Sequence, residues 1–285
     1  MKLYLPIVFA LLFTACELIN PEEDTPSYIY IDSFEVETSN LQGSHSSKIT
    51  DAWVWVDNEN LGVYPLPAYI PVLKSGVQDI HIEAGIKQNG ISASRINYPF
   101  YTPYSKAITL SPLKTDTISP LVTYSIDEMP FMIDFEGIGI NLEITSDSLN
   151  QQIEKENTLT ENRDILGYRY GKVVLEGNDD QVFECTTPEL NIPTDRPVYL
   201  EMDYKCNNTL VVGLYANSTT QVDKEAIIYL NPKEEWNKLY LSLSNYIVSY
   251  NNVNNYKVFF GMFKEADTTQ SEFCLDNVKI LYSEE

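Results

Sequence analysis

The chain has 285 residues and a formal net charge of −22, with 41 acidic side chains against 19 basic ones. A chain this acidic is repelled by the phosphates of nucleic acid, which excludes nucleic acid as a partner. It contains 20 Tyr and 11 Phe, and the periodicity of amphipathic helices is nearly absent, so we predict an all-β protein.

The N-terminal segment has the features of an export signal. An apolar run from Leu3 to Ala15 follows the single basic residue Lys2. A membrane-spanning helix needs about 20 apolar residues, and this run is shorter. A charged start, an apolar middle and a small-residue end are typical of a secretory signal peptide. The sequence therefore predicts an exported protein.

The signal ends in Phe13-Thr14-Ala15-Cys16, which resembles the lipobox of bacterial lipoproteins in the looser form of Bacteroidota. The resemblance implies a signal peptide over residues 1–15, acylation of Cys16 and a lipid-anchored acidic tether over residues 16–27. An ordinary signal peptide that happens to contain a cysteine is the alternative. We expect an outer-membrane lipoprotein that faces the cell surface, and an orientation toward the periplasm is the alternative.

Residues 28–126 alternate apolar and polar side chains in short segments. Two of them, AWVWV and LGVYPL, flank a turn at residues 57–60 and predict a β-hairpin. The order of this hairpin, a proline-containing segment and VQDIHIEAGI resembles PEGA-type repeats and related immunoglobulin-like or transthyretin-like sandwiches. The resemblance implies a structural or interaction module rather than an active site.

The segment INYPFYTPY, residues 96–104, is the strongest predicted contact surface of this first domain. Its two prolines argue against a central strand. Aromatic side chains are enriched at protein interfaces. We therefore expect exposed binding aromatics here, and the alternative is that the segment folds back over the first sandwich. The aromatic residues are Tyr98, Phe100, Tyr101 and Tyr104.

Residues 127–285 predict a second sandwich, built from about eight short strands separated by turns. In VYLEMDYKC, Leu200 and Met202 share one strand face while Glu201 and Asp203 share the other, so we expect one face in the core and one in water. The segments IDFEG, EEWNKLYLSL and FCLDNVKI resemble strands of the jelly rolls of carbohydrate-binding and galactose-binding-like modules. The predicted fold is thus two tandem β-sandwiches, immunoglobulin-like or transthyretin-like and then jelly roll.

The jelly-roll resemblance also implies a structural Ca²⁺ between the opening and closing strands. The matching positions are Asp134, Glu136 and Asp276. Carboxylate oxygens are ligands that Ca²⁺ prefers. The alternative is that Asp276 and Asn277 form a β-bulge or turn while Asp134 is solvated. No other cofactor is expected.

The run SNYIVSYNNVNNY, residues 244–256, predicts an exposed loop that can stack on a ligand and hydrogen-bond to it. Its tyrosines are Tyr246, Tyr250 and Tyr256, and five asparagines accompany them. Loops carry binding functions more often than cores do. We regard this loop as a candidate glycan site, with an ordinary polar loop as the alternative.

Catalytic and redox signatures are missing from the sequence. It contains no HExxH, GxSxG, Walker or GxGxxG pattern, and the two histidines, His45 and His81, lie far apart. Three cysteines follow Cys16, so at most one disulfide can form among them, and buried thiols are the preferred interpretation. We therefore predict that the protein is not an enzyme.

Our leading hypothesis from the sequence is a non-catalytic lipoprotein that acts as an accessory or adaptor subunit of an envelope complex. Its partners are then the membrane, through the lipid, and other outer-membrane proteins involved in assembly, secretion or uptake. The alternative is a surface glycan-binding lipoprotein of polysaccharide utilisation. A hydrolase that uses two carboxylates is the third possibility.

Overall fold

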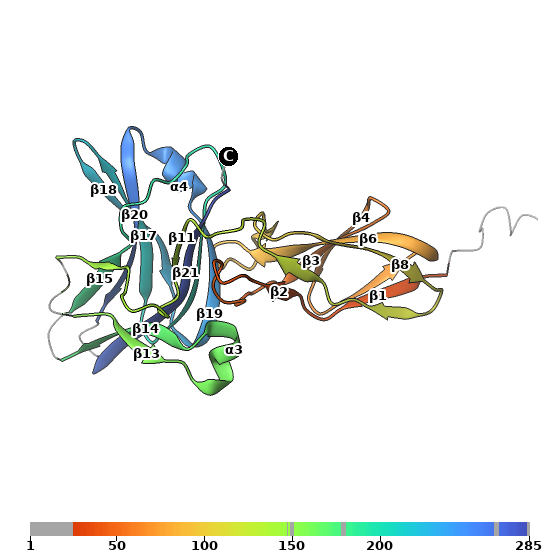
Figure 1. Ribbon diagram of the computed structural model, residues 1–285, viewed down its shortest axis with the longest axis horizontal. Helices are drawn as coiled ribbons and strands as arrows, with labels where there is room; N and C mark the ends of the chain where they lie inside the picture. Colours follow the sequence, from red (N-terminus) through yellow and green to blue (C-terminus); the bar gives the residue numbers. More distant parts are fainter. Residues whose placement is uncertain (1–24, 147, 149–150, 178–180, 265–267, 284–285) are drawn as a thin grey trace, which may run out of the picture.

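The computed structural model describes residues 25–146, 148, 151–177, 181–264 and 268–283. Its strands form two β-sandwiches placed end to end along the long axis of the molecule (Figure 1). The prediction of two tandem all-β sandwiches is confirmed. The signal segment and Cys16 lie outside the described residues.

The N-terminal sandwich packs a five-stranded sheet against a three-stranded sheet. The larger sheet contains β4 (Glu59–Pro65), β3 (Asp51–Val56), β6 (Gly76–Lys87), β7 (Arg95–Asn97) and β8 (Tyr104–Leu110). The smaller sheet contains β5 (Ala68–Val72), β1 (Ser27–Ile31) and β9 (Thr115–Thr117). A separate parallel pair joins β2 (Glu35–Glu37) and β10 (Leu121–Thr123). Ile, Val, Leu and Ala side chains fill the space between the two sheets.

Two hairpin turns of this sandwich follow directly from their residues. Asp57 and Asn58 connect β3 to β4 with φ angles of 50° and 64°, and Asn89 and Gly90 lie between β6 and β7 with φ angles of 57° and 67°. The two-residue turn between β3 and β4 needs this left-handed conformation, and the longer β6–β7 connection, residues 88–94, uses it near its start. Asn, Asp and Gly adopt this conformation most readily. The predicted β3–β4 hairpin is confirmed.

The C-terminal sandwich consists of two sheets that we call the junction sheet and the outer sheet. The junction sheet has the order β13 (Glu154–Asn157), β14 (Arg169–Glu176), β21 (Gln270–Leu281), β16 (Tyr199–Cys206) and β19 (Lys233–Ser242), with β11 (Phe131–Ile133) also paired to β21. The outer sheet has the order β12 (Glu143–Ile144), β15 (Val182–Thr186), β20 (Val253–Phe263), β17 (Leu210–Ser218) and β18 (Val222–Leu230). The described residues of this sandwich also form three short helical segments: η1 (Thr160–Asn162), α3 (Arg163–Leu166) and α4 (Ser244–Ser249).

The two sandwiches meet at a buried aromatic cluster, which we call the domain junction. Figure 1 shows β19 and β21 on the side of the C-terminal sandwich that faces the N-terminal one, and β16 pairs with both strands. The cluster combines side chains of both sandwiches: Tyr98, Phe100, Tyr101, Tyr124, Tyr199, Tyr240 and Leu281. Tyr98 contacts the rings of Tyr199 and Tyr240 with centroids 5.4 and 4.9 Å apart. The linkage between the sandwiches is therefore a packed core rather than a loose tether.

The predicted contact segment 96–104 is part of this junction. Tyr98, Phe100 and Tyr101 are only 1%, 3% and 7% exposed, so the prediction of exposed binding aromatics is wrong for them. Tyr104 is half-buried at the start of β8 and packs against the core of the N-terminal sandwich. The segment forms part of an interface within the chain. Its rings are buried because the C-terminal sandwich packs on them, and the sequence of the segment does not reveal this contact.

Charged side chains of the junction sheet are buried at the same place. Glu201 is 0% exposed, and its carboxylate accepts hydrogen bonds from Tyr98 at 2.6 Å and Tyr124 at 2.8 Å. Lys238 forms ion pairs with Glu201 at 3.2 Å and with Asp203 at 3.6 Å. The expectation that Glu201 and Asp203 face water is wrong, because the N-terminal sandwich covers their side of β16.

The three described cysteines, Cys185, Cys206 and Cys274, are free and buried, as predicted. Burial raises the pKa of the Cys274 thiol to about 12. A buried thiol with so high a pKa is unreactive at neutral pH. Among the described residues, no helix is long and apolar enough to cross a membrane.

Candidate functional site

The three predicted calcium ligands lie near one another, since the charges of Glu136 and Asp134 help to raise the pKa of Asp276, but they are not arranged as a metal site. Glu136 Oε1 instead accepts hydrogen bonds from the backbone N–H groups of Tyr168 and Arg169. Asp134 accepts one from the backbone N–H of Glu136 at 3.1 Å. Within the described ranges, no group of three His, Cys, Asp or Glu side chains is placed to hold a metal ion. The predicted calcium site is therefore not supported by this geometry.

Asp276 and Asn277 instead form an irregularity in β21. Asn277 has a φ of 46°, and the pairing with β16 shifts register at this point. This is the bulge that the sequence offered as the alternative to a metal site. Asp276 is 0% exposed, and its Oδ2 has no hydrogen-bond partner. Burial raises the pKa of Asp276 well above its ordinary value, and the charges of Asp203, Glu136 and Asp134 add to the shift.

The predicted Tyr/Asn loop is a short helix, α4, followed by a turn and strand β20. Tyr246 lies in α4 and packs partly against the core. Tyr256 is 3% exposed and donates a hydrogen bond to the Ile247 carbonyl at 3.0 Å, so the expectation that it is exposed is wrong. Tyr250 stays half-buried at the surface. Of the three tyrosines, it is the one whose position fits direct contact with a ligand.

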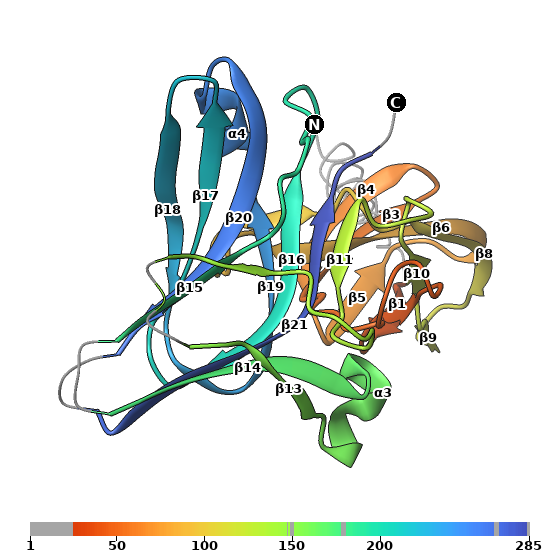
Figure 2. The ribbon, with the colours of Figure 1, turned by 60° about the vertical axis from the view of Figure 1, so that its left-hand side comes forward.

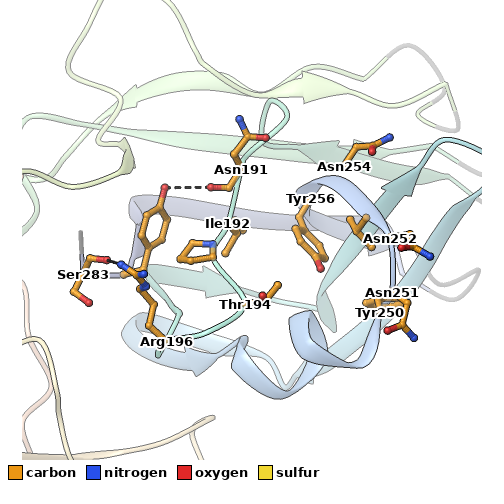
Figure 3. A pocket seen from close by; sticks show the side chains of 13 residues that line it. Asn191, Ile192, Thr194, Arg196, Tyr250, Asn251, Asn252, Asn254, Tyr256 and Ser283 are labelled. Atoms are coloured by element: carbon orange, nitrogen blue, oxygen red, sulfur yellow. Dashed lines mark hydrogen bonds between the residues drawn. The ribbon is translucent and has the colours of Figure 1, made fainter. Parts of the chain in front are cut away.

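Tyr250 lines an open hollow of about 660 Å³ at one end of the C-terminal sandwich. Figure 3 shows that its walls come from two segments, residues 191–196 before β16 and residues 250–254 after α4. The end of β21 closes it with Tyr282 and Ser283. We call it the end hollow. Its size falls within the range of about 300–1,000 Å³ found for small-molecule sites.

Amide groups dominate the wall formed by residues 250–254. Asn251, Asn252 and Asn254 are all exposed there. Asn252 has a φ of 57°, a conformation that Asn tolerates better than most residues, and this turn presents its neighbours to the hollow. Each amide offers two donors and one acceptor oxygen. The wall can therefore hydrogen-bond to a ligand rich in hydroxyl groups.

The Tyr250 ring is held in place by its own hydroxyl. This hydroxyl donates to Glu225 Oε2 at 2.6 Å, and burial together with this hydrogen bond raises the pKa of Tyr250. A ring fixed at both ends loses little conformational freedom when a ligand packs on it. Tyr250 is thus a neutral, pre-positioned aromatic surface.

Sequence reasoning missed the opposite wall of the hollow. Arg196 forms two hydrogen bonds to the neighbouring carboxylate of Asp195 and donates to the Ser283 carbonyl at 3.1 Å. Tyr282 donates to the Asn191 carbonyl at 3.5 Å (Figure 3). These residues lie tens of positions from Tyr250 in sequence and carry no motif. Only the pairing of β16 with β21 brings them to the same end of the sandwich.

The free face of the outer sheet is less suited to stacking. Tyr215 and Phe259 pack against each other with centroids 5.5 Å apart, and the ammonium of Lys224 lies over both rings at 5.2 and 5.1 Å. Glu184 fixes this arrangement through hydrogen bonds and ion pairs to Tyr215 and Lys224. The aromatic faces are already occupied, which leaves the end hollow as the better candidate site.

By sequence, the chain matches no protein-family model and no curated protein. By structure, it is similar to several carbohydrate-binding modules. One structure, of modules from the β-sandwich superfamily, has a TM-score of 0.44 at 11% identity and covers 92% of this chain and 100% of the other. A tandem pair of family 22 modules from Paenibacillus barcinonensis Xyn10C has a TM-score of 0.40 at 11% identity and covers 92% and 80%.

A family 11 module from Clostridium thermocellum, in complex with a β-1,3-1,4-mixed-linked tetrasaccharide, has a TM-score of 0.38 at 15% identity. This likeness covers 53% of this chain and 94% of the module. At these identities and scores the similarities concern the arrangement of strands. The ligand and the binding residues of this chain have to be argued from its own side chains.

Proposed function

We propose that the protein binds a carbohydrate chain without catalysis and that the end hollow is its binding site. The observation that carries the proposal is the meeting of Tyr250 with three exposed asparagines in one open hollow. A sugar ring has an apolar face, which packs on an aromatic side chain, and a rim of hydroxyl groups, which need both donors and acceptors. The end hollow offers both kinds of contact.

The adaptor function is not proposed further. Besides the predicted lipid anchor and the missing catalytic signatures, it was based on the aromatic side chains of residues 96–104 lying exposed as a contact surface for other proteins. Tyr98, Phe100 and Tyr101 are buried against the C-terminal sandwich instead. The aromatic segment 96–104 therefore no longer supports an adaptor function. The Tyr/Asn run 244–256, which favoured glycan binding, lines the end hollow.

The glycan proposal predicts that Tyr250→Ala and Asn251→Ala each weaken binding to a polysaccharide by about tenfold or more. Tyr250 supplies the stacking surface, whereas Asn251 is fully at the surface and can be truncated without disturbing the core. Affinity electrophoresis of the full chain against a panel of neutral polysaccharides, followed by calorimetry with the best one, measures the effect.

Tyr168→Ala is the matched control, because Tyr168 is 66% exposed and lies outside the end hollow. Its affinity should match that of the wild type. Circular dichroism of each variant tests whether the fold is intact. Absence of binding by the wild type to every polysaccharide, or equal binding by the Asn251→Ala variant, would contradict the proposal.

We also propose that the protein is lipid-anchored at Cys16 in the outer membrane and faces the cell surface. The support is the segment Phe13-Thr14-Ala15-Cys16 at the end of a short apolar signal. Stable anchoring needs more than one acyl chain, which the multiply acylated cysteine of a lipoprotein would supply. Cells fed a palmitate analogue should label the wild type and leave Cys16→Ser unlabelled and unprocessed. Equal labelling of both proteins would exclude the anchor.

A further inference from the structure

A second hollow lies between the two sandwiches, and its charge is unlike that of the rest of the chain. It has a volume of about 430 Å³ and lies between the β6–β7 turn and strands β18 and β19. Four lysines line it, and no acidic side chain does: Lys48, Lys87, Lys233 and Lys238. The whole chain has 41 acidic and 19 basic side chains, so a lining with only basic charged side chains is opposite in sign to the net charge of the chain. We call this site the lysine cleft.

The lysine cleft is held in shape by the contacts between the sandwiches. The backbone N–H of Asn89 donates to the Tyr240 carbonyl at 2.8 Å, and Asn89 Oδ1 accepts from the backbone N–H of Ser242 at 2.9 Å. These bonds fix the β6–β7 turn on strand β19. Lys87, at the end of β6, and Lys233, at the start of β19, therefore line the cleft from strands rather than from loops.

Two of the lysines, Lys87 and Lys233, lie close enough to disfavour the charge of Lys48. Partial burial lowers the pKa of Lys48, and the positive charges of Lys233 and Lys87 lower it further. Lys238 differs, because Glu201 and Asp203 neutralise it on its buried side. Among the ion pairs of the described residues, none involves Lys48, Lys87 or Lys233. An anion in the cleft would relieve this repulsion.

The remaining lining residues favour a sugar as the carrier of the anion. Tyr229 is 66% exposed on β18 and offers an aromatic face. Asn89, Asn231 and Asn237 contribute amides that can donate to or accept from hydroxyl groups. Asn89 Oδ1 and Asn237 Oδ1 already accept hydrogen bonds, from the Ser242 backbone N–H and from Lys48 Nζ, so these two amides have their N–H groups left for a ligand. A simple inorganic ion would use the lysines and leave the exposed ring of Tyr229 without a role.

We propose that the lysine cleft binds an anionic sugar unit, a saccharide that carries a carboxylate or a sulfate. Lys87, Lys233 and Lys48 surround the anionic group, Tyr229 packs on the sugar ring and the asparagines contact its hydroxyl groups. The site shares its general ligand class with the proposed function but uses different residues at a different place. The ligand class follows from the donors, because every charged group facing the cleft is a cation.

The test measures binding of the full chain to trigalacturonate, to a sulfated disaccharide and to neutral cellotriose by calorimetry at low salt. We expect one of the two anionic sugars to bind at least about tenfold more tightly than cellotriose. The double variant Lys87→Gln/Lys233→Gln should lose this preference by about tenfold or more, and Tyr229→Ala should weaken it too. Lys106→Gln/Lys114→Gln is the control, because it removes two positive charges outside the cleft and should change nothing.

Four outcomes would overturn the proposal. They are equal binding of anionic and neutral sugars, unchanged binding by the Lys87→Gln/Lys233→Gln variant, equal binding of a glutamate oligopeptide, and saturation by inorganic sulfate alone. The end hollow is tested separately by Tyr250→Ala. If Tyr250→Ala lost binding and Lys87→Gln/Lys233→Gln did not, the proposal that the lysine cleft binds an anionic sugar would be wrong. The proposed function of the end hollow would still stand.

Discussion

Replacing Glu201 with alanine is expected to lower the free energy of unfolding by about 3–5 kcal/mol. The carboxylate is fully buried at the domain junction, where Tyr98 and Tyr124 donate to it and Lys238 pairs with it. Its removal leaves two buried hydroxyl groups without an acceptor. It also leaves the ammonium of Lys238 with Asp203 alone, at 3.6 Å. Uncompensated buried charge is among the most destabilising changes that one substitution can make.

Urea denaturation followed by circular dichroism measures this loss. Glu201→Gln keeps an acceptor for a tyrosine but removes the charge, so its midpoint should lie between those of the wild type and Glu201→Ala. Glu235→Ala is the control, because Glu235 is an exposed residue of β19, and it should change stability by less than about 0.5 kcal/mol. If Glu201→Ala unfolded at the wild-type midpoint, the buried charges would not support the junction.

The strands were predictable because their signals are local. Alternation in VYLEMDYKC identifies β16, and the turn at residues 57–60 identifies the β3–β4 hairpin. Both signals are contained in short stretches of sequence, although β16 itself pairs with the distant strands β19 and β21. Hydrophobic periodicity and turn chemistry express such contacts directly.

The same patterns could not predict which strand faces are buried by the other sandwich and which are exposed to water. Alternation separates Glu201 and Asp203 from Leu200 and Met202, but it does not reveal that a second sandwich lies on the polar side. Buried carboxylates and buried lysines look like surface residues in sequence. Likewise, the prolines of residues 96–104 correctly exclude a central strand, yet they say nothing about what the neighbouring tyrosines contact.

The candidate site was partly predictable for a related reason. Tyr250 and the asparagines after it are adjacent in sequence, so their composition indicates a polar aromatic loop. Arg196 and Tyr282 reach the same hollow only through the topology of the sandwich. The lysine cleft has no sequence signal at all, because Lys48, Lys87 and Lys233 come from segments that meet only when the two sandwiches pack.

Tyr98→Ala tests whether the two sandwiches form one cooperative unit. The Tyr98 ring contacts four other aromatic rings, with centroids 4.9–5.6 Å apart, and two of these rings belong to the C-terminal sandwich: Phe100, Tyr101, Tyr199 and Tyr240. Truncation of a large buried aromatic side chain costs about 3–5 kcal/mol. Because the loss falls on the contact between the sandwiches, we expect scanning calorimetry to show two transitions in place of one.

Tyr98→Phe separates packing from hydrogen bonding in this prediction. The variant keeps the ring contacts and loses only the hydroxyl that donates to Glu201, so it should retain a single transition with stability reduced by about 1–3 kcal/mol. Tyr168→Ala removes an exposed ring at the surface and should behave like the wild type. If Tyr98→Ala kept one transition at the wild-type temperature, the aromatic cluster would not couple the sandwiches.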